Sequence, residues 1–447
     1  MQRRSLLAGA AALGLAAPSV TRAQGGSASR TEIQFWHAMP GVLGEIVGEQ
    51  VKRFNDSQAG VTVVPSFKGS YTDAMTGAIA AWRAGNPPHI VQVFEVGTAT
   101  MMSAGPAIRP VHELLAQSGV ALDPKRYLAG VRGYYSDTQG RLISMPHNSS
   151  SAIMWINLDA FDKAGLSTTD LPKTWKQIRA AAEKIKAANA APVAVTTSWP
   201  TWVMFEQMAA MHDVPFATLS NGFEGLGAEL RLTSPLFVKQ VEYLLALQKD
   251  GMFRYGGRDN AADGLFVAGE AAISFMSSSL RARVAKEARF KWASVPLPYH
   301  DDVIATPKNG VLGGASLWTL TSKTRTPAEY KGVAEFFRSI SDVDQDLWWH
   351  KATGYVPITL AAYEKAKAEG YYTQNPGADA AILQLSRAEP TPNSAGFRLG
   401  GMVEIRNIIQ EELEKALQGQ QPATAALESA NRRGNVVLRN FERANKA

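Results

Sequence analysis

"EIQFWHAMPGVLGEIVGEQVKRF", residues 32–54, contains a strand pattern followed directly by a helix pattern. Polar and apolar residues alternate over 32–36, as in a half-buried strand, and apolar residues then recur at helical spacing from Val42 to Phe54. The same order continues along the chain, with strand patterns over 61–67 and 89–94 and a helix pattern over 71–83. Strands and helices that alternate in this way predict a parallel sheet covered by helices.

The third of these strands ends in an acid, Glu95. An ionised carboxylate at the end of a buried strand is costly unless a partner pairs with it, so Glu95 is either a solvated loop acid or part of a site. In open α/β sheets, ligands bind beyond the carboxyl ends of the strands. His37, the segment 68–71 and Glu95 are all expected at this edge, which favours a site.

Length and composition are those of an ordinary globular protein. The chain has 447 residues, of which 45% are hydrophobic and 19% are charged. This length suits two domains or one large α/β body. Because no Pro/Gly/Ser linker divides the sequence into halves, we expect two α/β lobes joined by several crossing segments.

Residues 1–23 have the pattern of an export signal. Arg3 and Arg4 precede an apolar stretch over 6–17, and the small residues around Arg22 offer a cleavage site. The paired arginines resemble a twin-arginine signal, and a general secretory signal is the alternative. The stretch is too short to span a bilayer. We therefore expect a protein of the bacterial periplasm.

The remaining composition argues against several classes of protein. The segment 1–23 holds three arginines and no acid, so its removal lowers the formal charge from +6 to +3. The chain has no basic run with interleaved aromatic residues, so no nucleic-acid partner is expected. It has no cysteine, hence no disulfide and no lipidated cysteine. Its seven histidines show no metal-ligand spacing, and no H-E-x-x-H, P-loop or G-x-S-x-G motif occurs. We predict no enzyme activity, no metal and no cofactor.

Several motifs in the mature chain are similar to those of a known family. They are "FWHAMPG" (35–41), "FKGSY" (67–71), "VFEVGTATMM" (93–102), "GYYSD" (133–137), "NSS" (148–150), "NGFEG" (221–225), "GGASLW" (313–318), "TGYVPIT" (353–359), "NPGAD" (375–379) and "FRLGGM" (397–402). In this order they resemble the extracellular solute-binding proteins of ABC importers, and within that family the members that bind sn-glycerol-3-phosphate. "EVGTATMM" and "GGASLW" are the most specific of them.

The resemblance implies a type II periplasmic-binding-protein fold, in which each lobe is a mainly parallel sheet flanked by helices and a hinge joins the lobes. The expected division is residues 24–145 and 289–345 for the first lobe, and 146–288 and 346–447 for the second. The lobes would close on glycerol-3-phosphate or a glycerophosphodiester such as glycerophosphocholine. The expected partners are the membrane permease subunits of an ABC importer, and the expected state is a monomer.

The resemblance also implies a set of site residues. Tyr71 and Glu95 would hold the glycerol hydroxyls, and Trp199 and Trp202 would flank the ligand. The phosphate would be surrounded by Ser150, Ser277, the backbone N–H of Gly314, Tyr355 and Arg398. This set suits a phosphate monoester, which carries about −1.5 to −2 charge and three acceptor oxygens, because an Arg fork, hydroxyls and a glycine N–H all donate hydrogen bonds. The Glu95 carboxylate would accept from hydroxyls and repel inorganic phosphate.

Alternatives remain open for these assignments. Tyr71 could simply cap a helix, and Ser149 or Ser278 could act in place of Ser150 or Ser277. Gly314 could be a packing glycine, and the two tryptophans could belong to the core. Arg398 could pair with a structural acid. The alternative functions are a sugar-binding receptor of the same fold and a secreted phosphodiesterase, which would need a metal cluster or an activated nucleophile.

Overall fold

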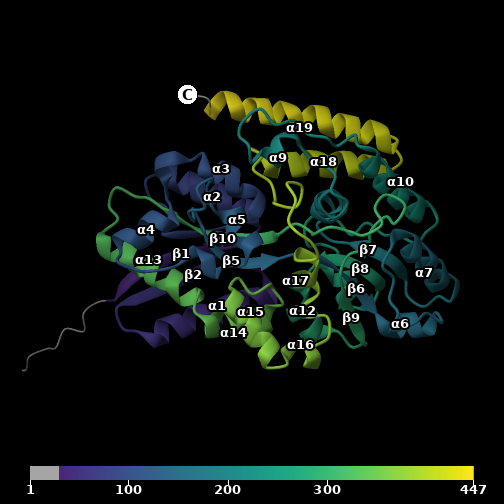
Figure 1. Ribbon diagram of the computed structural model, residues 1–447, viewed down its shortest axis with the longest axis horizontal. Coiled ribbons are helices and arrows are strands. Elements are labelled where there is room, and N and C mark those ends of the chain that lie inside the picture. Colours follow the sequence, from purple (N-terminus) through teal and green to yellow (C-terminus); the bar gives the residue numbers. More distant parts are fainter. Residues whose placement is uncertain (1–29, 446–447) are drawn as a thin grey trace, which may run out of the picture.

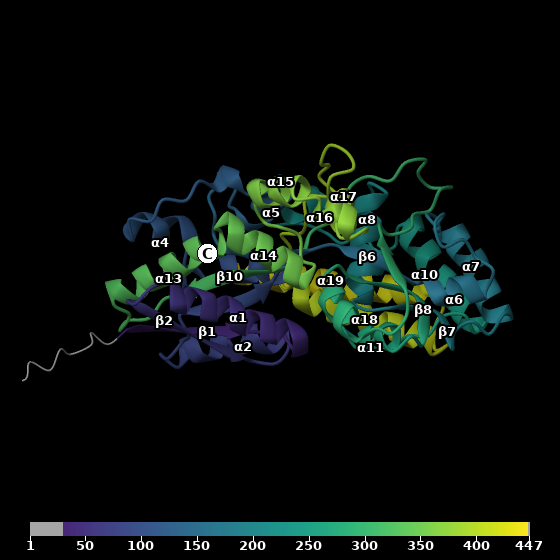
Figure 2. The ribbon, with the colours of Figure 1, turned by 90° about the horizontal axis from the view of Figure 1, so that it is seen from below.

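The computed structural model describes residues 30–445, so the predicted export signal at 1–23 lies outside the described residues. Two α/β lobes lie side by side along the long axis of the molecule (Figures 1 and 2). Each lobe is built around one sheet. The predicted two-lobed α/β fold is confirmed.

The first lobe contains a six-stranded sheet that includes the three strands predicted from the start of the sequence. Its strand order is β2-β1-β3-β10-β4, and β5 also pairs with β10. The strands are β1 (Thr31–His37), β2 (Val61–Phe67), β3 (Ile90–Phe94), β4 (Ile108–Arg109), β5 (Met145–Ser150) and β10 (Gly313–Leu320). The first three are parallel, as predicted, and the predicted helices are present as α1 (Gly41–Ser57) and α2 (Tyr71–Arg83). Ser70 and Asp73 form a capping box that starts α2.

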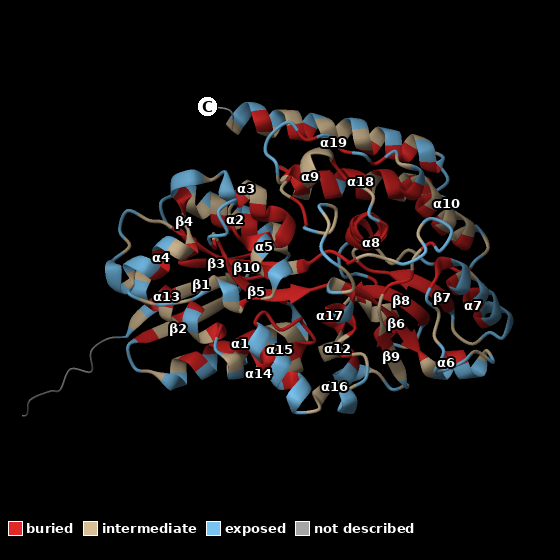
Figure 3. Ribbon diagram, in the orientation of Figure 1, coloured by how far each residue is buried: buried red, intermediate tan, exposed pale blue. Residues whose placement is uncertain are grey.

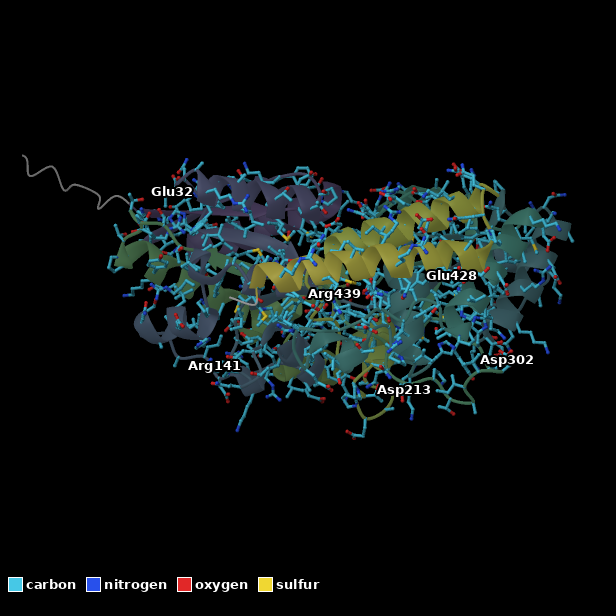
Figure 4. All side chains as sticks on the ribbon, turned by 90° about the horizontal axis from the view of Figure 1, so that it is seen from above. Glu32, Arg141, Asp213, Asp302, Glu428 and Arg439 are labelled. Carbon is cyan, nitrogen blue, oxygen red and sulfur yellow. The ribbon has the colours of Figure 1, made fainter. Side chains whose placement is uncertain are left out.

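The second lobe contains a four-stranded sheet and a long helical hairpin. The sheet order is β7-β8-β6-β9, with β6 (Ala152–Asn157), β7 (Val193–Thr197), β8 (Ala271–Ser277) and β9 (Trp292–Val295). The hairpin consists of α18 (Met402–Leu417) and α19 (Ala423–Asn445), which lie side by side in Figures 1 and 4. It packs on α10 (Pro235–Lys249).

The remaining elements are short or cover the faces of the sheets. They are η1 (Glu95–Gly97), α3 (Thr98–Met102), η2 (Gly105–Ala107), α4 (Val111–Gln117), η3 (Pro124–Arg126), α5 (Ala129–Tyr135), α6 (Leu158–Lys163), α7 (Trp175–Ala187), η4 (Trp202–Glu206), α8 (Gln207–Met211), α9 (Thr218–Gly222), α11 (Asp263–Val267), α12 (Leu280–Glu287), α13 (Pro327–Ile340), α14 (Val343–Thr353), α15 (Leu360–Ala368), α16 (Tyr371–Gln374) and α17 (Ala380–Leu385).

The sheets are more mixed than predicted. In the first sheet β10 runs antiparallel to β3, β4 and β5, and in the second only β7 and β8 are parallel. The reason is that several strands enter a sheet from the other lobe and not through a local helical crossover, so nothing forces them to be parallel.

The lobe boundaries also differ from the prediction at two places. β5 (Met145–Ser150) pairs with β10 in the first sheet, and β9 (Trp292–Val295) pairs with β6 in the second. Only Ser151 separates β5 from β6, so the chain passes between lobes within one extended run. The sequence has no Gly or Pro over 147–157, so no turn residue marks the crossing at Ser151, and the division implied by the resemblance placed it between residues 145 and 146.

Both sheets lie in the buried interior (Figure 3). Trp155 and Trp175 are among the largest fully buried side chains of the second lobe, and Phe35 is one in the first. No described helix has both the length and the apolar character that a membrane span requires.

Candidate functional site

A cavity of about 360 Å³ lies between the two lobes. All the predicted site residues except Arg398 line it, namely Tyr71, Glu95, Ser150, Trp199, Trp202, Ser277, Gly314 and Tyr355. Asp259, Asp263, Ser279 and Arg406 line it as well. The first lobe contributes to this wall from the carboxyl ends of β1, β2 and β3, as expected for an open α/β sheet.

Tyr71 begins α2 at this sheet edge and is fixed by two contacts. Its ring stacks on Phe94, with centroids 5.2 Å apart and planes 4° apart, and its hydroxyl accepts a hydrogen bond from Asn148 Nδ2 at 2.8 Å. Burial raises the pKa of Tyr71 well above its ordinary value. The hydroxyl therefore stays protonated at neutral pH and is available as a donor.

A group of neutral donors lies on another side of the cavity. Ser277 Oγ and Ser279 Oγ are 2.9 Å apart, and Ser279 is the residue before α12 (Leu280–Glu287). Ser150 and Tyr355 line the same cavity, whereas the alternatives Ser149 and Ser278 do not. The group thus combines hydroxyls with the N-terminus of a helix, where partial positive charge collects.

Gly314 has a backbone that only glycine tolerates. Its φ is +100°, and a Cβ added there would lie 1.8 Å from the carbonyl oxygen of Asn148. β5 and β10 approach this closely where Gly314 pairs with Ser149. The glycine is therefore required for packing, and it also lines the cavity.

Glu95 is neither a solvated loop acid nor unpaired. It is 4% exposed, and its Oε1 accepts a hydrogen bond from Arg406 Nη2 at 2.5 Å. Arg406, on α18, also donates to both carboxylate oxygens of Glu206 at 2.7 Å. Burial raises the pKa of Glu95, and Arg406 opposes this shift. Burial disfavours the charge of Arg406, but the two carboxylates outweigh it and raise the pKa of Arg406.

Arg398 does not lie where the resemblance implied. Its Nη2 donates to the backbone carbonyls of Tyr134 and Ser136, each at 2.6 Å, and its guanidinium lies 5.0 Å from the centre of the Phe223 ring. Its backbone N–H donates to the carbonyl of Asn221. These contacts hold the side chain between the lobes and outside the cavity lining, because the Tyr134–Ser136 carbonyls offer acceptors that the segment can reach.

Arg406 is the guanidinium that sequence reasoning missed. The sequence contains a pattern that could have identified this residue. Arg406 occupies the apolar face of its helix together with Met402, Ile405 and Ile409, and all four are buried. An arginine on the buried face of an amphipathic helix requires partners. Glu206 carries the same signal, since it interrupts the apolar run "WVMFEQMAAM" (202–211).

Trp199 and Trp202 differ in their surroundings. Trp202 is 5% exposed, and a Cβ added to Gly313 would meet its ring, so it belongs to the core as well as to the cavity wall. Trp199 is partly buried, with its ring centroid 6.4 Å from that of Tyr71. Its φ of +49° is unusual for a bulky residue and is held by the hydrogen bond of its N–H to the Asp259 carbonyl.

Two further acids line the second-lobe side of the cavity. Asp263 Oδ1 accepts from Ser198 Oγ at 2.6 Å, and Asp259 follows Arg258 in the loop before α11. Burial raises the pKa of Asp263 to about 6, against the effect of the Ser198 hydrogen bond. Residues 30–445 contain no group of three or more His, Asp or Glu side chains arranged to hold a metal ion.

Comparison with known proteins places the chain in a family. Residues 49–380 match the family described as bacterial extracellular solute-binding protein. The chain is 44% identical to the sn-glycerol-3-phosphate-binding periplasmic protein UgpB of Rhizobium meliloti (strain 1021), over 91% of this chain and 94% of that protein. It is 42% identical to the protein of the same name from Yersinia pseudotuberculosis serotype I (strain IP32953), over 93% and 94%.

Solved structures agree on the fold. UgpB from Mycobacterium tuberculosis, in complex with glycerophosphocholine, superposes with a TM-score of 0.77 at 20% identity, covering 92% of this chain and 98% of that one. Maltose-bound MalE3 of T. maritima superposes with a TM-score of 0.73 at 17% identity, covering 91% and 99%. With the cavity between two α/β lobes and the sequence match over most of its length, the chain belongs to the family of bacterial extracellular solute-binding proteins.

Proposed function

We propose that this protein is a periplasmic receptor that binds sn-glycerol-3-phosphate and delivers it to the permease of an ABC importer. The observation that carries the proposal is the interlobe cavity, which joins a group of neutral donors to a carboxylate–guanidinium cluster. Relatives that are 42–44% identical are named for binding this compound. The predicted export signal at 1–23 and the periplasmic names of these relatives support the location.

The phosphate is assigned to the neutral donors. Ser150, Ser277, Tyr355 and the N–H of Gly314 offer several hydrogen bonds to its oxygens, and Ser279 places the N-terminus of α12 beside them. A helix N-terminus attracts anions through its free N–H groups and its dipole. This arrangement supports binding of a dianion without a dedicated cation at that end.

The glycerol hydroxyls are assigned to Glu95, Tyr71 and Arg406. Glu95 can accept and Arg406 can donate, so together they satisfy a hydroxyl in both directions. Arg406 is the arginine that lines the cavity, whereas Arg398, which the resemblance placed at the phosphate, does not line it. The charge of Arg406 is already shared with two carboxylates, which suits a neutral hydroxyl better than a phosphate.

The cavity also supports longer phosphodiester ligands. At about 360 Å³ it falls within the roughly 300–1,000 Å³ range of pockets for larger ligands. Asp259, Asp263 and the ring of Trp199 line the second-lobe side. Carboxylates and an aromatic face favour a cationic headgroup. We therefore include glycerophosphodiesters such as glycerophosphocholine among the proposed ligands.

Calorimetric titration of the mature protein with glycerol-3-phosphate, glycerophosphocholine, maltose and inorganic phosphate tests the proposal. We expect binding of the first two and little or none of the last two. Binding of maltose alone would support the sugar-receptor alternative. Hydrolysis of glycerophosphocholine during the titration, to choline and glycerol-3-phosphate or to glycerol and phosphocholine, would support the phosphodiesterase alternative. Size-exclusion chromatography with light scattering tests the expectation that the protein is a monomer.

A further inference from the structure

Glu206 lies behind the wall of the cavity and has no role in the function proposed so far. It is 1% exposed, and it does not line the cavity. It ends η4 (Trp202–Glu206), a π-helical turn that begins with the cavity residue Trp202. Such turns are rare and occur frequently at functional sites. Glu206 therefore does not touch a ligand in the cavity, and it can act on one only through a neighbouring side chain or through its charge.

That neighbour is Arg406, and the geometry of the contact is specific. The two Glu206 carboxylate oxygens accept from Nε and Nη2 of Arg406, both at 2.7 Å. This two-point contact fixes the plane of the guanidinium. It also directs Nη2 to Glu95 on the first lobe, at 2.5 Å. Among the described residues Nη1 makes no hydrogen bond, so it is the nitrogen left for a ligand.

The charges of these three residues do not cancel. With both carboxylates ionised, the cluster of Glu95, Glu206 and Arg406 carries one net negative charge. All three side chains are buried, so their fields are screened less than at the surface. Without Glu206, the cluster would be neutral and the arginine would be free to turn towards an anion.

We propose that Glu206 is a positioning and selectivity residue of this receptor. It holds Arg406 so that Nη1 is presented to a ligand hydroxyl, and it supplies the negative charge that keeps inorganic phosphate away from the hydroxyl end of the cavity. The inference rests on the proposed function, because it assumes that the hydroxyls of a phosphoester bind beside Glu95.

The test measures selectivity in Glu206→Gln. This variant keeps the shape of the side chain and removes its charge. Calorimetry with glycerol-3-phosphate and with inorganic phosphate gives the ratio of the two dissociation constants. We expect the dissociation constant for phosphate divided by that for glycerol-3-phosphate to fall at least about tenfold. The reason is that glycerol-3-phosphate loses a hydrogen-bond donor held in position, whereas phosphate gains an arginine that is free to turn towards it. Parallel changes in both affinities would indicate a merely structural role and would overturn the proposal.

Glu412→Gln is the matched control. Glu412 lies on the same helix as Arg406, is 2% exposed, and pairs with Lys415 and Arg433 away from the cavity. Its loss also removes a buried carboxylate that forms ion pairs, but we expect the selectivity ratio to stay at the wild-type value. A fall of the ratio in Glu412→Gln as large as in Glu206→Gln would contradict a specific role for Glu206.

Glu206→Asp separates the effect of the charge from the effect of the side chain's position. It also tests the proposal if Glu206→Gln does not fold. It keeps the net charge and shortens the side chain by one methylene. We expect phosphate to stay rejected while glycerol-3-phosphate binds about five- to tenfold more weakly. An unchanged affinity of Glu206→Asp for glycerol-3-phosphate would overturn the positioning role. The wild-type titration with glycerol-3-phosphate reports separately on the proposed function.

Discussion

Arg406 contacts carboxylates from both lobes, whereas Arg398 contacts no carboxylate and donates to backbone carbonyls of the other lobe. At the scale of the residue this difference is why we propose that Arg406, and not Arg398, acts on the ligand. We expect Arg406→Ala to weaken glycerol-3-phosphate binding by at least about 30-fold, since loss of one partner of a buried charged pair costs about 2–5 kcal/mol. Calorimetry measures this loss, and chemical denaturation checks that the variant is folded.

Arg433→Ala is the control for this substitution. Arg433 pairs with Glu411 and Glu412 at the helical hairpin and does not line the cavity, so its loss should leave affinity unchanged. Normal binding by Arg406→Ala would show that the guanidinium takes no part in recognition.

A second prediction at the scale of the residue concerns Asp263, which should make the stability of the protein depend on pH. Its pKa in the folded protein is about 6, above the ordinary value of 3.8. Because the folded state binds this proton more tightly than the unfolded state does, the contribution of Asp263 to the free energy of unfolding should rise as the pH falls from 7 to 5. Asp263→Asn cannot titrate and should lack this contribution. Urea unfolding of both proteins at several pH values without ligand measures it, and identical pH profiles would refute the assignment.

At the scale of the element, the close approach of β5 and β10 depends on Gly314. An alanine there would place its Cβ 1.8 Å from the Asn148 carbonyl oxygen, at a φ of +100°. We expect Gly314→Ala to cost about 1–3 kcal/mol or more of unfolding free energy, as overpacking does, and to weaken ligand binding. Thermal and chemical unfolding with calorimetry measure both effects.

Gly130→Ala serves as the comparison for Gly314. Gly130 lies within α5, its φ is not positive, and a Cβ there meets no atom within 4 Å. Because alanine is the better helix former, we expect a gain of about 0.5–1 kcal/mol in unfolding free energy and no change in binding. Equal stabilities of the two variants would contradict the packing role of Gly314.

At the scale of the whole molecule, contacts far apart in sequence join the lobes. Arg398 reaches the carbonyls of Tyr134 and Ser136, and Lys286 pairs with Glu45. A hinge between the lobes would break such contacts on opening. We expect Arg398→Ala to favour the open form, with a larger radius of gyration without ligand and a loss of affinity of a few-fold that is equal for all ligands. Small-angle X-ray scattering and calorimetry measure these changes.

Arg398→Lys provides the comparison for lobe closure. Lysine keeps the charge but cannot reach two carbonyls from one planar group, so it should restore only part of the compactness. A change of ligand preference in Arg398→Ala would instead place this residue at the ligand, as the sequence resemblance implied.

The amino-acid sequence by itself determined the parallel β1–β2–β3 core and the edge at which Glu95 and Tyr71 meet. The physical reason is that strand and helix periodicities are local, and the carboxyl ends of parallel strands share one edge. Its motifs also determined the family and the serine, glycine and tyrosine residues that line the cavity.

Only the tertiary structure decided which strand joins which sheet and which arginine reaches the cavity. The sequences of β5 and β6 have the pattern of ordinary neighbouring strands, yet the lobe boundary falls at the single residue between them. Arg406 meets Glu206 and Glu95 across 200 and 311 residues of sequence. The apolar face of α18 indicates locally that Arg406 needs partners, but which carboxylates it meets depends on how α18 packs against η1 and η4, and such long-range contacts leave no pattern in the sequence.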